Sequence, residues 1–215
     1  MFSMAASKYW NLYCHVGGTN GTESAKVHGL GCRIGPGFVL TAAHVYRQYQ
    51  LPTVLLTNGL WECAVVREWE QLDISLVRVT KQLKATGIGE EPEEYPALSS
   101  RLPSLGASLG YIGWLNLLDE SGKRSGRTYF WQGHVAFFEK GLKGQTLLAI
   151  AGSAVQQGFS GGPVFTVDGT LSGVLVEALQ YVPELPHPVQ QVNSLPLVSP
   201  IAKIRNELLA CMQAA

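Results

Sequence analysis

The most informative stretch of this 215-residue chain is Gly158-Phe159-Ser160-Gly161-Gly162-Pro163. A serine hydroxyl attacks a carbonyl well only when a base removes its proton and hydrogen-bond donors meet the developing oxyanion. Glycines beside a serine let the backbone turn so that two N–H groups converge on one point, and they let a substrate approach closely. We therefore predict Ser160 as a nucleophile, with the backbone N–H groups of Gly158 and Ser160 as oxyanion donors. A glycine-rich turn that carries a surface serine is the alternative interpretation.

Two further segments contain the groups that such a serine needs. In residues 38–45, FVLTAAHV, a short apolar strand leads into small residues and then His44, and the alanines leave room for a buried carboxylate to reach the imidazole ring. In residues 72–79, LDISLVRV, Asp73 opens an apolar strand, and a partly buried acid requires a partner. Taken singly, His44 could be structural or exposed, and Asp73 could cap a strand or turn. Together with Ser160 they predict a histidine base that is oriented by an aspartate.

Short apolar runs punctuated by 24 glycines and 11 prolines make up most of the chain, which is typical of many strands joined by turns. Asn58-Gly59 and Asp168-Gly169 each lie between apolar runs and predict hairpins, because tight hairpin turns need residues that tolerate positive φ. Only the C-terminal segment looks helical, with Ser199 as N-cap and Pro200 at the first helical position. The pattern predicts an all-β fold of paired antiparallel barrels with a C-terminal α-helix.

The same patterns divide the chain into parts. Alternation predicts a half-buried strand at residues 9–16, with Trp10, Leu12, Cys14 and Val16 on one face. Gly17-Gly18 begins a loop, and residues 114–127 form a long exposed loop. We expect one domain over residues 1–215. Its parts are an N-terminal barrel at about 1–85, a linker at 86–101, a C-terminal barrel at 102–198 and a helix at 199–213.

Composition excludes several classes of partner. Hydrophobic residues make up 46% of the chain and charged residues 15%, so a sizeable core can form. Lys+Arg and Asp+Glu number 16 each, so the formal net charge is zero. The chain therefore lacks the excess of positive charge that is typical of proteins that bind nucleic acid or an anionic membrane surface. No apolar run reaches the ~18–20 residues that span a bilayer. Residues 1–16 lack the signal-peptide pattern, so we expect a cytoplasmic, intracellular protein.

The four cysteines are Cys14, Cys32, Cys63 and Cys211. They form no CxxC pair and no metal-ligand spacing with histidines. Without a secretory signal, free buried thiols are favoured over disulfides. We expect neither a metal nor another cofactor.

The order His44, Asp73, Ser160, each on its own strand or turn, resembles the chymotrypsin/trypsin-like serine protease superfamily. The resemblance runs from about Val27 to the C-terminal helix, and it is closest to the disulfide-free bacterial-type branch that includes the HtrA proteases. It implies two six-stranded antiparallel β-barrels and a serine endopeptidase. In that chemistry Ser160 Oγ attacks the scissile carbonyl, His44 takes its proton, and Asp73 holds the imidazole tautomer.

The resemblance also implies where a protein or peptide substrate lies. Val176, Glu177 and Ala178 match the strand that pairs with the substrate backbone. Ala154 and Val155 match the primary specificity pocket, and neither is charged. A small or medium apolar side chain is therefore expected before the scissile bond. Because broad digestion inside a cell would be toxic, the expected role is regulated cleavage of one protein. A regulatory protein partner is a further expectation.

Three departures from the family pattern keep an alternative open. Val45 follows His44, where secreted members carry a cysteine. Phe159 stands where members that are activated by a freed N-terminus carry an acidic residue. HtrA proteases usually have an asparagine there and a PDZ domain afterwards, and this chain has neither. The alternative is a non-catalytic or partner-activated peptide-binding module on the same fold.

Overall fold

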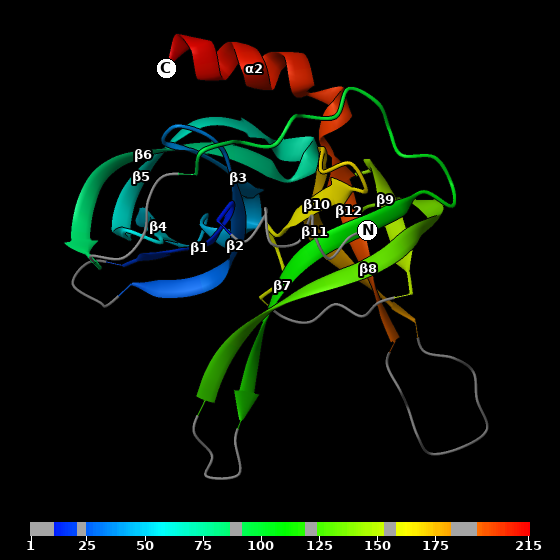
Figure 1. The fold of residues 1–215 in the computed structure, drawn as a ribbon, viewed down its shortest axis with the longest axis horizontal. Helices are drawn as coiled ribbons and strands as arrows, with labels where there is room; N and C mark the ends of the chain where they lie inside the picture. Colours follow the sequence, from blue (N-terminus) through cyan, green and yellow to red (C-terminus); the bar gives the residue numbers. More distant parts are fainter. Residues whose placement is uncertain (1–10, 21–24, 87–91, 119–123, 153–157, 182–192) are drawn as a thin grey trace.

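Two barrels lie side by side in this computed structural model (Figure 1). The structure describes residues 11–20, 25–86, 92–118, 124–152, 158–181 and 193–215. Each barrel is closed, has six strands and pairs its described neighbours in antiparallel fashion. The predicted fold class is confirmed.

The first barrel has the strand order β1-β2-β3-β6-β5-β4. Its strands are β1 (Tyr13–Thr19), β2 (Lys26–Gly35), β3 (Phe38–Ala42), β4 (Leu51–Leu56), β5 (Gly59–Trp69) and β6 (Ile74–Ala85). A 3-10 helix, η1 (Ala43–Val45), follows β3, and a second, η2 (Glu70–Leu72), joins β5 to β6. His44 lies in η1, and Asp73 directly follows η2.

The second barrel has the strand order β10-β11-β12-β9-β8-β7. Its strands are β7 (Ser108–Leu118), β8 (Arg124–Lys140), β9 (Thr146–Ala151), β10 (Pro163–Thr166), β11 (Leu171–Tyr181) and β12 (Asn193–Pro200). The chain then forms η3 (Ile201–Lys203) and α2 (Arg205–Ala214). Helix α2 lies across the top of the molecule in Figure 1, so the end of the chain returns over the barrels.

Buried side chains of the two barrels form one common hydrophobic cluster. Leu12, Cys14 and Val16 of the N-terminal segment are buried on one face, as their alternation predicted. They belong to one hydrophobic cluster with residues of the second barrel such as Ile112 and Val174. This shared core holds the facing surfaces of the two barrels together.

Both predicted hairpin turns are confirmed. Gly59 has φ +152° and pairs with Leu56 directly across the turn between β4 and β5. Gly169 has φ +89°, and the turn between β10 and β11 is closed by the bond from Thr166 N–H to Thr170 O at 3.0 Å. Gly169 lies within its turn, and Gly59 is the first residue of β5 after its turn. Both adopt positive φ values that residues with a side chain disfavour.

Two predicted loops are strands. Gly17 and Gly18 continue β1 and pair with Thr53 and Pro52 of β4. A Cβ on Gly17 would lie 1.8 Å from the Lys26 carbonyl oxygen, so the glycine permits a close strand approach rather than a loop. Residues 114–127, expected as an exposed loop, belong largely to β7 and β8. These strands pair continuously as far as residues 118 and 124 and extend as an arm below the barrel in Figure 1.

The predicted start of the C-terminal helix is wrong. Ser199 and Pro200 end β12, where Pro200 pairs with Gly173 of β11, and α2 begins only at Arg205. The N-cap is Ile204, which makes no side-chain capping bond. Closing the second barrel requires this last strand, and the pairing overrides the local preference of Ser-Pro for a helix start.

All four cysteines are free, as expected, and three of them are buried, while Cys211 is half-buried. Burial raises the pKa of the Cys63 thiol to about 12 and also raises the pKa values of Cys14 and Cys32. These three thiols therefore stay protonated and pack as small apolar side chains.

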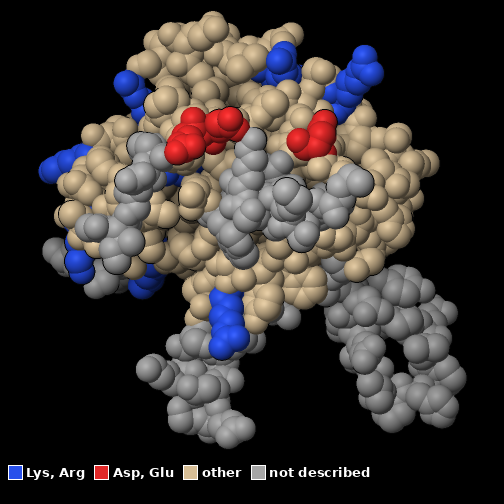
Figure 2. All heavy atoms as spheres, viewed as in Figure 1, with Lys and Arg blue, Asp and Glu red and all other residues tan. Residues whose placement is uncertain are grey.

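Charged side chains are dispersed over the face shown in Figure 2. Lys and Arg lie apart from one another there, and Asp and Glu form small groups among uncharged residues. None of the described helices is long and apolar enough to cross a membrane.

Candidate active site

His44 and Asp73 meet because the strands that carry them are neighbours. His44 is the middle residue of η1, after β3, and Asp73 lies between η2 and β6, while Ala42 of β3 pairs with Ile74 of β6. The distance between His44 Nδ1 and Asp73 Oδ2 is 2.5 Å. The His44 backbone N–H also donates to Asp73 Oδ1 at 3.1 Å. A carboxylate only accepts, so Nδ1 carries a proton, and in the neutral ring Nε2 is the acceptor.

Asp73 occupies an unusual backbone position. Its φ of 54° and ψ of 35° are left-handed, and it is the one non-glycine residue with positive φ among those described. Aspartate tolerates this region better than most residues. Asp73 is only 6% exposed, whereas the His44 side chain is 45% exposed. The arrangement places a buried acid behind an accessible imidazole, and backbone strain of this kind often occurs at functional sites.

A second network ties the His44 and Asp73 segments together. The Tyr46 hydroxyl donates to Glu68 Oε2 at 3.0 Å and accepts a hydrogen bond from Ser75 Oγ, and Arg47 Nε donates to Glu68 Oε1 at 3.1 Å. Burial is the main cause that raises the pKa of Tyr46, and the Arg47 hydrogen bond is the main cause that lowers the pKa of Glu68. Tyr46 and Ser75 each lie two residues after His44 and Asp73. No motif marked this network, because Glu68 reaches it only through the pairing of β5 with β6.

Ser160 lies in a tight turn that both barrels hold. Gly162 N–H donates to Phe159 O at 2.9 Å across the turn, and Gly161 at its third position has φ +83°, as a type II turn requires. Leu30 N–H of β2 donates to Ser160 O at 2.7 Å, and Gly161 N–H donates to Leu175 O of β11 at 2.7 Å. The turn is therefore fixed between the first and the second barrel.

Glycine makes this close approach feasible. A Cβ on Gly161 would lie 1.9 Å from Leu30 O. A Cβ on Gly29 would lie 2.4 Å from Ser160 O and 2.9 Å from Val45 Cγ2. Gly29 thus lies close both to the Ser160 carbonyl and to the side chain of Val45, the residue that follows His44. No motif marks Gly29, although a glycine inside an apolar strand is a signal of close backbone approach.

The hydroxyl and the predicted oxyanion donors are uncommitted. Within the described part of the chain, Ser160 Oγ makes no hydrogen bond, to His44 or to any other residue. The N–H groups of Gly158 and Ser160 likewise donate to no backbone carbonyl of a described residue. Gly158 has φ +96°.

The predicted substrate strand borders the Ser160 turn. Strand β10 pairs with β11 only as far as Val174, and the Ser160 turn takes the next position at Leu175. Beyond Leu175, this edge of β11 pairs with no strand in the described structure. Val176 is buried, Glu177 is half-buried and accepts a bond from Gln145 Nε2 at 3.2 Å, and Ala178 is exposed. Ala154 and Val155 lie outside the described residues.

Comparison with known proteins identifies the family of this chain. The family described as trypsin-like peptidase domain matches residues 29–174, which is more than half of the chain. The chain belongs to the trypsin-like peptidase family. The match confirms the predicted superfamily, and its span contains His44, Asp73 and Ser160.

A solved structure supports the same fold for this trypsin-like peptidase domain. The protease domain of MamO from Magnetospirillum magneticum, in its apo form, is similar with a TM-score of 0.64 and 16% sequence identity. The similarity covers 94% of this chain and 98% of that one, and at this identity it concerns the fold alone. No curated protein matches the chain. Among the described residues, no group of three or more His, Cys, Asp and Glu side chains could hold a metal ion.

Proposed function

We propose that this trypsin-like peptidase is an intracellular serine endopeptidase that uses Ser160, His44 and Asp73. The observation that carries the proposal is the 2.5 Å contact between His44 Nδ1 and the buried Asp73 carboxylate, because it leaves Nε2 as the basic atom of the ring. Nε2 takes the proton of Ser160 Oγ while Oγ attacks the scissile carbonyl. The N–H groups of Gly158 and Ser160 stabilise the oxyanion. His44 then protonates the leaving amine, and water hydrolyses the acyl-enzyme.

The proposed substrate is an extended segment of a protein or peptide. Its backbone adds to the open edge of β11 at Val176, Glu177 and Ala178, as in β-strand addition. From the family resemblance we infer that the uncharged Ala154 and Val155, which lie outside the described residues, contribute to the pocket for the residue before the scissile bond. A small or medium apolar side chain is the proposed preference there.

The proposal is tested by reaction with a fluorophosphonate probe. We expect the wild type to be labelled and Ser160→Ala to remain unlabelled. Asp73→Asn provides a sharper comparison, because asparagine also tolerates the left-handed conformation while it cannot hold the catalytic tautomer. We expect Asp73→Asn to fold with a melting temperature close to that of the wild type and to react about 10⁴-fold more slowly. A peptide library then measures the preferred side chain.

A folded wild type that resists the probe would contradict the proposal. Binding of library peptides without cleavage would then identify the non-catalytic alternative. Labelling that appears only after a second protein is added would identify a partner-activated protease. The uncommitted Ser160 hydroxyl makes these the relevant competing outcomes.

A further inference from the structure

Phe159 precedes the proposed nucleophile, takes no part in the proposed chemistry, and is completely buried. Its side chain belongs to the core of the second barrel, in a cluster that also contains Leu109, Val135 and Leu148. A turn that presents a half-exposed serine thus has its neighbouring side chain anchored in the interior. This contrast between adjacent residues requires an explanation.

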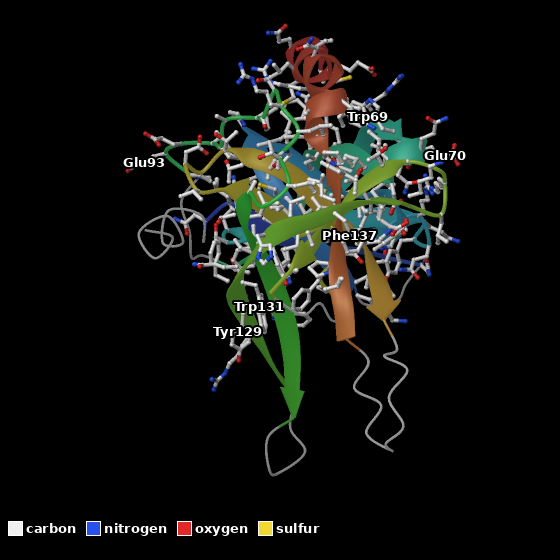
Figure 3. The ribbon with its side chains drawn as sticks, turned by 90° about the vertical axis from the view of Figure 1, so that its right-hand side faces the viewer. Trp69, Glu70, Glu93, Tyr129, Trp131 and Phe137 are labelled. Carbon is white, nitrogen blue, oxygen red and sulfur yellow. The ribbon has the colours of Figure 1, made fainter. Side chains whose placement is uncertain are left out.

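Two aromatic rings lie next to the Phe159 ring. Its ring centroid lies 6.4 Å from that of Tyr111 at an interplanar angle of 61°, and 6.4 Å from that of Trp131 at 47°. Trp131 in turn lies 6.2 Å from Tyr129, and the two point from the same part of β8 in Figure 3. These separations are typical of favourable aromatic pairs.

Glycine in β7 makes the space for this ring. A Cβ on Gly113 would lie 2.2 Å from Phe159 Cε2. The backbone of the turn also lies on β7: a Cβ on Gly162 would be 2.6 Å from Ile112 O, and one on Gly158 would be 3.8 Å from Trp114 O. The segment from 158 to 162 therefore rests on three consecutive residues of β7, and the Phe159 ring enters the barrel at the middle one.

We infer that Phe159 is the positioning residue of the proposed oxyanion hole. Its buried ring fixes the backbone of residue 159. The following peptide unit carries the Ser160 N–H, and the preceding residue, Gly158, carries the other donor, so both proposed donors lie within one residue of the anchor. The inference rests on the proposed function, and Phe159 touches no reacting atom. A phenyl ring carries no charge, so Phe159 anchors the turn by core packing.

The experiment compares Phe159→Leu with Phe165→Leu. Phe165 is a matched control, because it is also completely buried and lies on β10 only five residues after Ser160. We expect both variants to lower the melting temperature similarly. Only Phe159→Leu should lower kcat, by about 10²-fold with little change in KM, since misplaced oxyanion donors weaken the transition state and not ground-state binding.

A complementary pair tests the fit of the ring directly. Gly113→Ala places a methyl group against the Phe159 ring and should lower kcat. The double variant Gly113→Ala/Phe159→Leu should recover part of that loss, because the smaller side chain makes room for the methyl group. A general loss of stability would predict the opposite order, with the double variant slower than either single one.

Hydrogen–deuterium exchange of the peptide spanning residues 158–163 provides a readout that does not need activity. We expect faster exchange there in Phe159→Leu and not in Phe165→Leu. If the wild type resists the fluorophosphonate, the proposed function fails, and this exchange contrast still decides whether Phe159 anchors the turn. Equal exchange or equal kcat in the two variants would overturn the inference.

Discussion

At the scale of single residues, the hydrogen bonds of the Asp73 carboxylate offset the strain of the Asp73 backbone. Its left-handed backbone costs roughly 1–2 kcal/mol for a residue with a Cβ. That conformation turns the carboxylate toward both the Nδ1 and the backbone N–H of His44. A buried charge is tolerated when hydrogen bonds surround it. The left-handed backbone of Asp73 and its hydrogen bonds to His44 therefore depend on each other.

Glu68 gives a prediction about pH. The hydrogen bond from Arg47 holds the pKa of Glu68 below its usual value of about 4.3. A lowered folded pKa means that the stabilisation is fully present above the unfolded pKa and is lost as the pH falls through the folded pKa. We expect Glu68→Gln to lower the melting temperature near neutral pH. The difference from the wild type should shrink in acid below about pH 4. Thermal unfolding of both proteins over this range measures it, and a difference that is constant with pH would contradict the assignment.

At the scale of elements, two turns contain glycines with similar φ values but different surroundings. Gly37, between β2 and β3, has φ +71°, and Gly161, in the Ser160 turn, has φ +83°. A Cβ on Gly37 would meet nothing within 4 Å, whereas one on Gly161 would lie 1.9 Å from Leu30 O. The first turn faces open space, and the second is held between two barrels.

Alanine at these two positions should therefore have different effects. We expect Gly37→Ala to lower the free energy of unfolding by about 1–2 kcal/mol, the strain of a left-handed residue, and to leave fluorophosphonate labelling unchanged. Gly161→Ala should cost more, because the methyl group also collides with backbone, and it should lose labelling. Urea denaturation and labelling rates measure both effects. Equal costs at the two sites would show that the Ser160 turn can move away from β2.

At the scale of the whole molecule, the barrels are joined by more than the linker. The hydrophobic cluster that contains Leu12 and Leu40 of the first barrel also contains Ile112 and Val174 of the second. The Tyr13 hydroxyl and Thr128 Oγ1 lie 3.0 Å apart across the interface. A site assembled from both barrels requires this fixed relative placement.

The shared core predicts a single unfolding transition. Leu40→Ala removes a fully buried side chain from the first barrel and should lower the free energy of unfolding by about 2–5 kcal/mol. We expect far-UV circular dichroism and tryptophan fluorescence to report the same midpoint in the wild type and in the variant. A variant with two transitions, one of them at the wild-type midpoint, would show that the barrels unfold separately.

Local sequence was sufficient for the parts of the fold and site that depend on neighbouring residues. Asn58-Gly59 and Asp168-Gly169 predicted their hairpins because turn conformation is a property of the turn residues themselves. The short apolar runs with their turns, together with the order His44, Asp73, Ser160, predicted the two-barrel fold. The alternation at Leu12, Cys14 and Val16 predicted a buried face.

Tertiary packing decided the features that depend on residues far apart in the chain. Ser199 and Pro200 became strand and not helix because β11 pairs with them. Gly17 and Gly18 became strand because β2 and β4 approach closely there. Phe159 gained its anchoring position from rings on β7 and β8, which local sequence does not reveal. In each case a contact with a distant strand outweighs the local conformational preference, because burial and strand pairing involve more free energy than the choice of a single cap or turn.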